Sequence, residues 1–321
     1  MGDVATAIDE PAELRLEAFR GELTGYCYRM LGSAFEAEDA VQDTMIRAWR
    51  GLGRFEGRAT LRSWLYRIAT NVCLDMLGSA QRRARPMDLG PAGTAHSAPG
   101  DPLPENVWVG PVPDGRVTVT ASDPAEVAVS RESIRLAFVA ALQHLPARQR
   151  AVLILREVLA WSAAEVAELL GTSVASVNSA LQRARATLAD ADLGGDTLRP
   201  MDPDQSKLLD QYVKAFEGYD IDGLTALLHE DVTLNMPPLS LWLRGHADIG
   251  GWMLGTDSGC RGSRLVPTVA NGMPAFGQYR PTGPWALIVL DISGGRIRGI
   301  TNFLDVERLF PLFGLPIRFE G

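Results

Sequence analysis

The 321-residue chain is poor in several features that define whole classes of protein. Its three cysteines, Cys27, Cys73 and Cys260, are odd in number and far apart in the sequence. This pattern excludes a disulfide framework and a cysteine-rich zinc site, and it suits reduced thiols in protein cores. No apolar run approaches the roughly 20 residues of a membrane helix, and residues 1–11 lack the pattern of a secretory signal. We therefore expect a cytoplasmic protein without membrane contact, and we identify no metal site and no cofactor.

The chain also lacks a basic excess. Its 31 lysines and arginines face 39 aspartates and glutamates, which gives a net charge of −8, whereas nucleic-acid-binding domains are usually basic. The charge is uneven, because Arg82, Arg83 and Arg85 form a cluster without a neighbouring acid and residues 182–185 are also locally basic. The acidic net charge excludes a histone-like coating protein, but the local basic clusters are compatible with DNA contacts at individual sites. The acidic surface can face a basic protein partner.

Apolar spacing and proline content divide the chain into three folded blocks. The first and second blocks show the 3.6-residue spacing of helices. The segment between them has six prolines at positions 91 to 113 and no sustained period, which predicts a flexible linker. We place the blocks at 12–85, 124–192 and 204–321, and the linkers at 86–123 and 193–203.

The third block combines helices with strands. Its patterns predict helices at 208–218, 220–228 and 247–254 and a strand at 231–236. The apolar runs 285–290 and 296–300 are joined across Ser293-Gly294-Gly295, which predicts a β-hairpin. The expected fold is therefore multidomain, with two all-α domains followed by an α+β domain.

A capping box opens a helix in the first block. Ser33 followed by Glu36 has the required spacing, and the helix is expected to run to about Arg50. Its inward face is predicted to hold Ala37, Val41, Met45, Ala48 and Trp49. Asp39 and Asp43 lie on the outer face as a like-charge pair, which costs about 0.2–0.5 kcal/mol in isolation. Two interpretations stay open at this point: a solvated polar face, or a surface that a basic partner neutralises.

A second helix is expected after Thr60. Its buried stripe is predicted at Leu61, Leu65, Ile68, Val72 and Met76. The outer face mixes arginines, an aromatic ring, hydroxyls and an amide. Cations hold phosphates, rings stack on unpaired bases, and amides and hydroxyls meet base edges, so such a face suits single-stranded DNA. An ordinary amphipathic helix is the alternative.

The motifs of this block occur together in a characteristic order. They are Asp39-Ala40-Val41-Gln42-Asp43-Thr44, then Ala48-Trp49, Phe55, and Trp64 through Asn71 with Asp75. This arrangement resembles region 2 of the extracytoplasmic-function sigma factors of bacterial RNA polymerase. The resemblance implies docking on the clamp of the largest polymerase subunit through Asp39, Gln42 and Asp43. It also implies capture of the promoter −10 element by Phe55, Arg58, Arg62, Ser63, Tyr66, Arg67, Thr70 and Asn71.

The second block has the form of a helix-turn-helix. Ala167 is small where two helices cross, Gly171 permits a tight turn, and Thr172 or Ser173 can cap the next helix. The packing face of that helix is predicted at Val174, Val177, Leu181, Ala184 and Leu188. A plain helical hairpin is the alternative, but the stretch resembles sigma region 4. That resemblance implies recognition of the −35 element, where short polar side chains approach the major groove. The matching positions are Thr172, Ser173, Ala175, Ser176, Asn178, Ser179, Gln182 and Arg183.

The third block resembles SnoaL-like α+β cone domains. Tyr212, residues 227–232 and residues 244–246 carry this similarity. The resemblance implies a built-in regulator that contacts the sigma domains within the chain. Candidate pocket residues are Asp231, His246, Arg280 and Asn302. Acid–base catalysis needs a pair of groups within hydrogen-bonding reach, and the sequence does not demonstrate such a pair. We therefore expect this block to bind without catalysis. Binding of a small ligand is kept as an alternative.

The combined prediction is an alternative sigma factor with a fused modulating domain. It would bind the polymerase core and promoter DNA and carry out no reaction itself. A ligand-responsive helix-turn-helix regulator is one alternative, and it would bind palindromic sites as a dimer. A SnoaL-like enzyme fused to a DNA-targeting module is the other.

Overall fold

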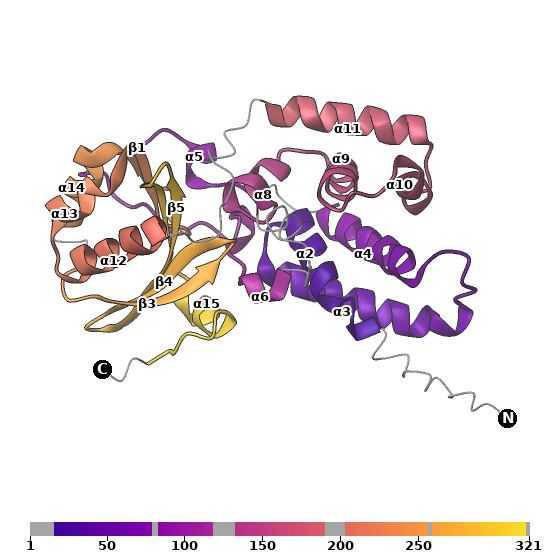
Figure 1. Cartoon of the computed structure of the whole chain (residues 1–321), viewed down its shortest axis with the longest axis horizontal. Coiled ribbons are helices and arrows are strands. Elements are labelled where there is room, and N and C mark those ends of the chain that lie inside the picture. The colour runs from indigo at the N-terminus through magenta and orange to yellow at the C-terminus, as the bar shows by residue number, and fades with distance from the viewer. Residues whose placement is uncertain (1–15, 79–82, 118–131, 190–202, 256–258, 319–321) are drawn as a thin grey trace.

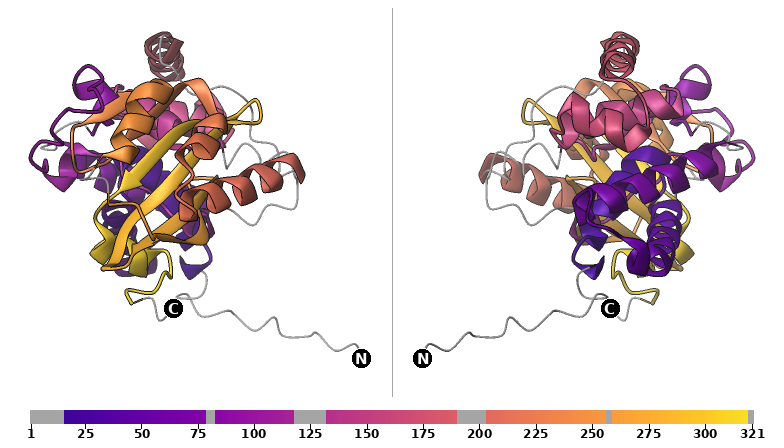
Figure 2. Two further views of the ribbon diagram at one scale, coloured as in Figure 1. Left: turned by 90° about the vertical axis from the view of Figure 1, so that its left-hand side faces the viewer. Right: turned by 90° about the vertical axis from the view of Figure 1, so that its right-hand side faces the viewer.

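The computed structural model describes residues 16–78, 83–117, 132–189, 203–255 and 259–318 (Figure 1). The two helical blocks lie together at one end of the molecule, and the strand-rich block lies at the other (Figures 1 and 2). The prediction of two all-α domains followed by an α+β domain is confirmed.

The first helical block consists of α2 (Arg20–Leu31), α3 (Ala34–Gly51), a 3-10 turn η1 (Leu52–Arg54) and α4 (Leu61–Leu77). The predicted cap of α3 is present, because Ser33 Oγ accepts the Glu36 N–H at 3.3 Å. The second helix starts after Thr60 as expected, and Thr60 Oγ1 caps it by accepting the Ser63 N–H at 3.1 Å. The inward face of α3 includes Ala37, Val41 and Ala48, as predicted. Trp49 is 62% exposed, so its assignment to the core is wrong. Trp49 lies in the last turn of α3, at the edge of the block, where its side chain faces solvent.

The second helical block contains α8 (Leu136–Leu142), α9 (Ala147–Leu153), a π-helical turn η3 (Ile154–Val158), α10 (Ala163–Leu170) and α11 (Val174–Ala189). Gly171 ends α10 with φ of 60°, a left-handed conformation that favours glycine. Ser173 Oγ accepts the Ser176 N–H at 3.1 Å and caps α11. The predicted helix-turn-helix is therefore present. Val174 is exposed rather than packed, because it lies in the first turn of α11, beyond the edge of α9 and α10.

The third block is a curved sheet with three helices on one face and its last helix on the other. Its elements are α12 (Pro203–Glu217), α13 (Ile221–Ala226), β1 (Leu228–Asn235), β2 (Trp242–Arg244), α14 (Gly245–Leu254), β3 (Arg264–Ala270), β4 (Met273–Arg280), β5 (Gly283–Ser293), β6 (Arg296–Phe303) and α15 (Val306–Leu312). The strand order is β2-β1-β6-β5-β4-β3. Only the β1–β6 pair is parallel among the strand pairs of the described residues. The predicted hairpin is confirmed, with Ser293 opposite Arg296.

The two faces of the sheet belong to different cores. Side chains alternate between the faces of a strand, so Phe276 and Ile288 pack with the block's own helices α12 to α14. Ala275, Leu287 and Val289 lie on the opposite face, in one continuous core with residues of both helical blocks. The third block is therefore built onto the helical blocks through buried apolar surface.

The segment of residues 83–117, which we call the interdomain segment, is ordered, whereas a flexible linker was expected at 86–123. It contains α5 (Pro86–Leu89), η2 (Glu105–Val107) and α6 (Asp114–Val117). Its apolar side chains Trp108, Val109 and Val112 are buried against the neighbouring blocks, and the Gly110 N–H donates to the Gly32 carbonyl at 2.9 Å. The apolar residues of this segment follow neither a helical nor a strand period, so the sequence predicts no local structure for it. Contacts with the neighbouring blocks determine its conformation instead. Residues 118–123 lie outside the described residues.

The basic cluster near position 83 is partly internal. Arg83 forms an ion pair of 2.5 Å with Glu36 and donates to the Trp108 carbonyl at 2.7 Å. Its side chain is only 6% exposed, so it ties the interdomain segment to α3 and is not available for DNA. Arg82 lies outside the described residues.

Buried arginines also join the two helical blocks. Arg29 on α2 donates from Nε and Nη2 to Ser133 Oγ at 3.0 and 2.8 Å. Burial lowers the pKa of Arg29 to about 10, so it remains charged at neutral pH. Arg150 on α9 donates to the Met30 carbonyl and to Gln143 Oε1. Because a buried charge costs free energy unless it is hydrogen-bonded, these contacts favour one relative placement of the blocks.

A single asparagine lies where all three blocks meet. Asn271 is fully buried at the β3–β4 turn, with φ of 57°. Its Nδ2 donates to the Ile134 carbonyl and to the Tyr28 hydroxyl, each at 2.6 Å, and its Oδ1 accepts the Val112 N–H at 3.0 Å. The turn of the sheet thus contacts the first block, the interdomain segment and the start of the second block through one side chain.

Candidate functional sites

The predicted docking residues lie along the outer face of α3. Asp39 and Gln42 are exposed, and Asp43 is paired with Arg47 at 2.8 Å. Ile46 and Trp49 continue the same stripe and are 41% and 62% exposed. Positions 39, 42, 46 and 49 are three and four residues apart, which places them on one helical face. The sequence analysis missed the apolar half of this face, although the spacing from Gln42 to Trp49 signals it.

The predicted −10 residues on α4 divide into two groups. Ser63, Arg67 and Asn71 reach the surface, and Phe55 in the preceding loop packs on Trp64 with ring centroids 5.0 Å apart. Arg58 in that loop is exposed and ion-paired with Glu56.

Tyr66 and Thr70 are buried, so their placement on the outer face is wrong. The Tyr66 ring lies between Tyr26 and Trp161, with centroids 5.1 Å from each. Thr70 Oγ1 is 2.8 Å from the Tyr26 hydroxyl. Burial raises the pKa of Tyr66 well above its ordinary value. The physical reason is that α4 is covered on two sides, by its own block and by the second helical block.

The second helical block engages part of the face predicted to bind DNA. Arg62 pairs with Glu22 at 2.9 Å, and its guanidinium carbon is 5.4 Å from the Trp161 ring centroid. Arg67 Nη2 donates to the Glu168 carbonyl at 3.0 Å. Trp161 and Glu168 belong to the helix-turn-helix, so α4 and α10 share an interface in this arrangement of the molecule.

The predicted −35 residues are all exposed and are brought together on the helix-turn-helix. Thr172, Ser173, Ala175, Ser176, Asn178, Ser179, Gln182 and Arg183 lie on the turn and on the outer face of α11. Arg183 Nη1 donates to Ser179 Oγ at 2.6 Å. Figure 1 shows α11 along the edge of the molecule, away from the sheet. This helix presents short polar groups at its start and longer Gln and Arg side chains one to two turns later, which suits a major groove.

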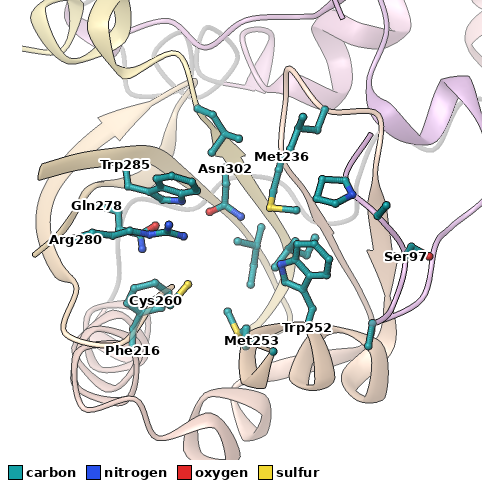
Figure 3. Close-up of a pocket in the computed structure, with 18 of the residues that line it drawn as sticks. Ser97, Phe216, Met236, Trp252, Met253, Cys260, Gln278, Arg280, Trp285 and Asn302 are labelled. Carbon is teal, nitrogen blue, oxygen red and sulfur yellow. The ribbon is translucent and has the colours of Figure 1, made fainter. Parts of the chain in front are cut away.

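The third block encloses a cavity of about 650 Å³ between its sheet and helices (Figure 3). Of the four predicted pocket residues, Arg280 and Asn302 line this cavity. Asp231 instead pairs with Arg244 at 2.8 Å on the surface, and His246 Nε2 lies 3.0 Å from the His229 carbonyl. The four residues therefore do not form one site. Asp231 occupies an exposed position of β1, and His246 is at the exposed start of α14.

Other cavity residues were not predicted. Gln278 lies two residues before Arg280 on β4, and Trp285 lies on the adjacent strand β5. The Arg280 guanidinium carbon is 3.2 Å from the Trp285 ring centroid. Burial lowers the pKa of Arg280 and raises the pKa of the nearby Cys260 thiol. Alternation along β4 from Arg280 to Gln278 is the signal that could have found Gln278. None of the described residues lining the cavity is a carboxylate.

The described residues hold no group of three or more His, Cys, Asp or Glu side chains placed to bind a metal. None of the described helices is long and apolar enough to cross a membrane.

Comparison with known proteins identifies the family. Residues 16–83 match Sigma-70 region 2 and residues 135–188 match Sigma-70, region 4. The sigma factor SigG of Mycobacterium tuberculosis (strain ATCC 25618 / H37Rv) is 43% identical over an alignment that covers 96% of this chain and 86% of SigG. The chain belongs to the extracytoplasmic-function sigma factors. SigJ of the same strain is 32% identical, with 91% of each chain covered.

The fold of this sigma factor agrees with a solved relative. The crystal structure of Mycobacterium tuberculosis SigJ matches it with a TM-score of 0.60 at 24% identity, covering 95% of this chain and 99% of the SigJ chain. The prediction of an alternative sigma factor that directs transcription initiation is confirmed. The match to SigJ extends over the C-terminal α+β domain and shows a shared fold there. Neither the helix-turn-helix regulator nor the fused enzyme is favoured, because regions 2 and 4 both match.

Proposed function

We propose that this sigma factor makes three contacts in promoter recognition, each on a different helix. The outer face of α3, with Asp39, Gln42, Asp43, Ile46 and Trp49, docks on the polymerase core. Carboxylates there meet basic side chains, and the exposed Trp49 fills an apolar pocket, since buried aromatic anchors dominate interface energies. We also propose that the three domains span residues 12–85, 124–192 and 204–321.

The two DNA contacts use α4 with its preceding loop and α11. Phe55, Arg58, Ser63, Arg67 and Asn71 are the proposed −10 contacts that reach the surface, with Arg62 beside them. Exposure of the eight residues on the helix-turn-helix supports their role at the −35 element. Tyr66 and Thr70 instead support the α4 helix from inside, so their effect on the −10 element is indirect.

We further propose that the arrangement of the helical blocks is a closed one. The observation that carries this is the contact of α4 with α10 and the loop before it. Arg62 lies over Trp161 of that loop, and Arg67 donates to the Glu168 carbonyl on α10. A base stacked near Arg67 would compete with these interactions. Opening of this contact therefore accompanies engagement of the −10 element.

The C-terminal domain is proposed to set how readily the helical blocks separate. Asn271 contacts both blocks, and Asp291 on β5 pairs with the buried Arg135 at the start of α8. These contacts favour the closed arrangement over any opened one, so a change in the C-terminal domain can alter promoter opening without touching DNA. Its action is binding and contains no catalytic step.

Run-off transcription with purified bacterial core polymerase tests the docking face. The double variant Asp39→Lys with Asp43→Lys should lower core affinity at least tenfold, because two attractive charges become repulsive. The matched control, Asp222→Lys, reverses an exposed charge on α13 and should leave affinity unchanged. Equal affinity of the double variant and the wild type would refute the docking face, and failure of the wild type to support any promoter-specific transcription would contradict the sigma assignment for this chain.

A further inference from the structure

The interdomain segment forms one wall of the cavity in the C-terminal domain. Residues 95–99 line the cavity together with side chains of the sheet and of α14. Figure 3 shows Ser97 at one end of the cavity and Gln278, Arg280 and Trp285 at the other. We call residues 90–99 the strap.

Specific hydrogen bonds hold the strap against the domain. The Gly93 N–H donates to the Trp242 carbonyl at 2.8 Å, and Trp242 Nε1 returns a bond to the Gly90 carbonyl at 2.9 Å. The Ala95 N–H donates to Asp248 Oδ1 at 3.0 Å. A turn within the strap, in which the Ser97 N–H donates to the Thr94 carbonyl at 3.0 Å, is thus held in place by β2 and α14.

The strap is continuous with the part of the chain that contacts the helical blocks. After residue 99 the segment runs to Gly110, which bonds the end of α2, and to Val112, which bonds Asn271. One continuous described segment thus connects the cavity wall at residues 95–99 to the junction of the three blocks.

The chemistry of the cavity selects a class of ligand. Its middle is apolar, with Met236, Trp252 and Met253 facing the open space (Figure 3). One end carries the Arg280 guanidinium and the Gln278 amide, and Tyr212 contributes a fully buried hydroxyl without a hydrogen-bond partner among the described residues. An acceptor atom on a bound molecule can satisfy a buried donor of this kind. A volume of about 650 Å³ lies within the range of small-molecule pockets, which is roughly 300–1,000 Å³.

We propose that the cavity binds an apolar, ring-containing small molecule with one anionic or carbonyl oxygen group, and that the strap transmits its binding to the sigma domains. The oxygen group lies at the Arg280 and Gln278 end, and the ring system extends toward residues 95–99. Because the strap supplies part of the wall, the ligand gains its full set of contacts only when the strap is closed. Binding therefore stabilises the closed strap. This inference rests on the proposed modulating function of the C-terminal domain.

The probe for the test is 8-anilinonaphthalene-1-sulfonate, which combines an apolar ring system with one anionic group. Its fluorescence is titrated on the full-length chain, without polymerase or DNA. The expected result is one saturable site per chain, with affinity reduced at least tenfold by Met253→Trp, which fills the cavity. Trp285→Ala at the partly exposed rim keeps the core intact and should weaken binding at least threefold. Thr268→Trp, which lies in a separate groove beside α12, is the matched control and should change nothing.

Amide hydrogen exchange measures the coupling. Saturating probe should slow exchange at Gly93 and Ala95 at least fivefold in the wild type, and should not do so in Met253→Trp. Absence of saturable binding at millimolar probe, or equal binding by wild type, Met253→Trp and Trp285→Ala, overturns the site. Binding that leaves exchange at Gly93 and Ala95 unchanged overturns the strap. These readouts are independent of transcription, so their failure is distinguishable from failure of the proposed function.

Discussion

Replacing Asn271 gives the sharpest test of the three-way junction. The side chain satisfies the Val112 N–H, the Ile134 carbonyl and the Tyr28 hydroxyl, all at a buried position. Asn271→Gly removes these three bonds while keeping a residue that tolerates the φ of 57°. Tyr28 still donates to the Gly110 carbonyl at 2.8 Å, so two buried polar groups lose their partner.

The magnitude follows from those two groups. Each buried group left unsatisfied costs about 1–3 kcal/mol, so the two groups together should lower the free energy of unfolding of Asn271→Gly by about 2–6 kcal/mol. Asn271→Ala loses the same bonds and also places an L-residue with a Cβ in the left-handed region, which costs about 1 kcal/mol more. The order of stability is therefore Asn, then Gly, then Ala.

Urea denaturation followed by tryptophan fluorescence measures these differences, and small-angle X-ray scattering reports whether the folded blocks separate. We expect the Gly variant to have a larger radius of gyration than the wild type under native conditions. A loss below 0.5 kcal/mol in both variants, with unchanged scattering, would refute the role of Asn271 at the junction. Equal stability of the Gly and Ala variants would refute the backbone part of the reasoning.

Three further predictions concern single side chains. Trp49→Ala should weaken binding to core polymerase by about 2 kcal/mol, as expected for an aromatic anchor, with unchanged thermal unfolding; unchanged affinity by fluorescence anisotropy would remove Trp49 from the docking face. Arg183→Ala should weaken binding to a −35 duplex by about 1–3 kcal/mol, and a gel-shift titration in which duplex affinity stays the same would contradict the assignment of α11. Burial raises the pKa of Cys260 more strongly than Gln278 and Arg280 lower it, so its thiolate forms only at higher pH than in an unfolded chain. Alkylation of native Cys260 by iodoacetamide should therefore keep accelerating above pH 9, and a plateau below that pH would show that burial does not control this thiol.

Local structure was largely predictable from the sequence. A capping box acts over three positions, so Ser33 and Glu36 located the start of α3. Gly171 located the turn of the helix-turn-helix, because glycine adopts the left-handed conformation at low energetic cost and most other residues do not. Apart from Val174, the residues of α11 were assigned to the correct face, because only one face of that helix packs on its neighbours α9 and α10 and helical periodicity then decides exposure.

Tertiary structure decided the features that depend on a second neighbour. Tyr66 was assigned to the surface because periodicity assumes one buried face, whereas α4 is covered on two sides and Trp161 closes over it. Residues 83–117 acquire their order from contacts with distant blocks, which no local pattern records. Asp231 and Arg280 were grouped by residue type, yet the sheet places one on the surface and the other in the cavity. Sequence alone thus determined the helices, the turns and the sigma family of this protein. The closed arrangement, the junction at Asn271 and the strap over the cavity were decided by the tertiary structure, because the burial of each residue depends on the whole chain.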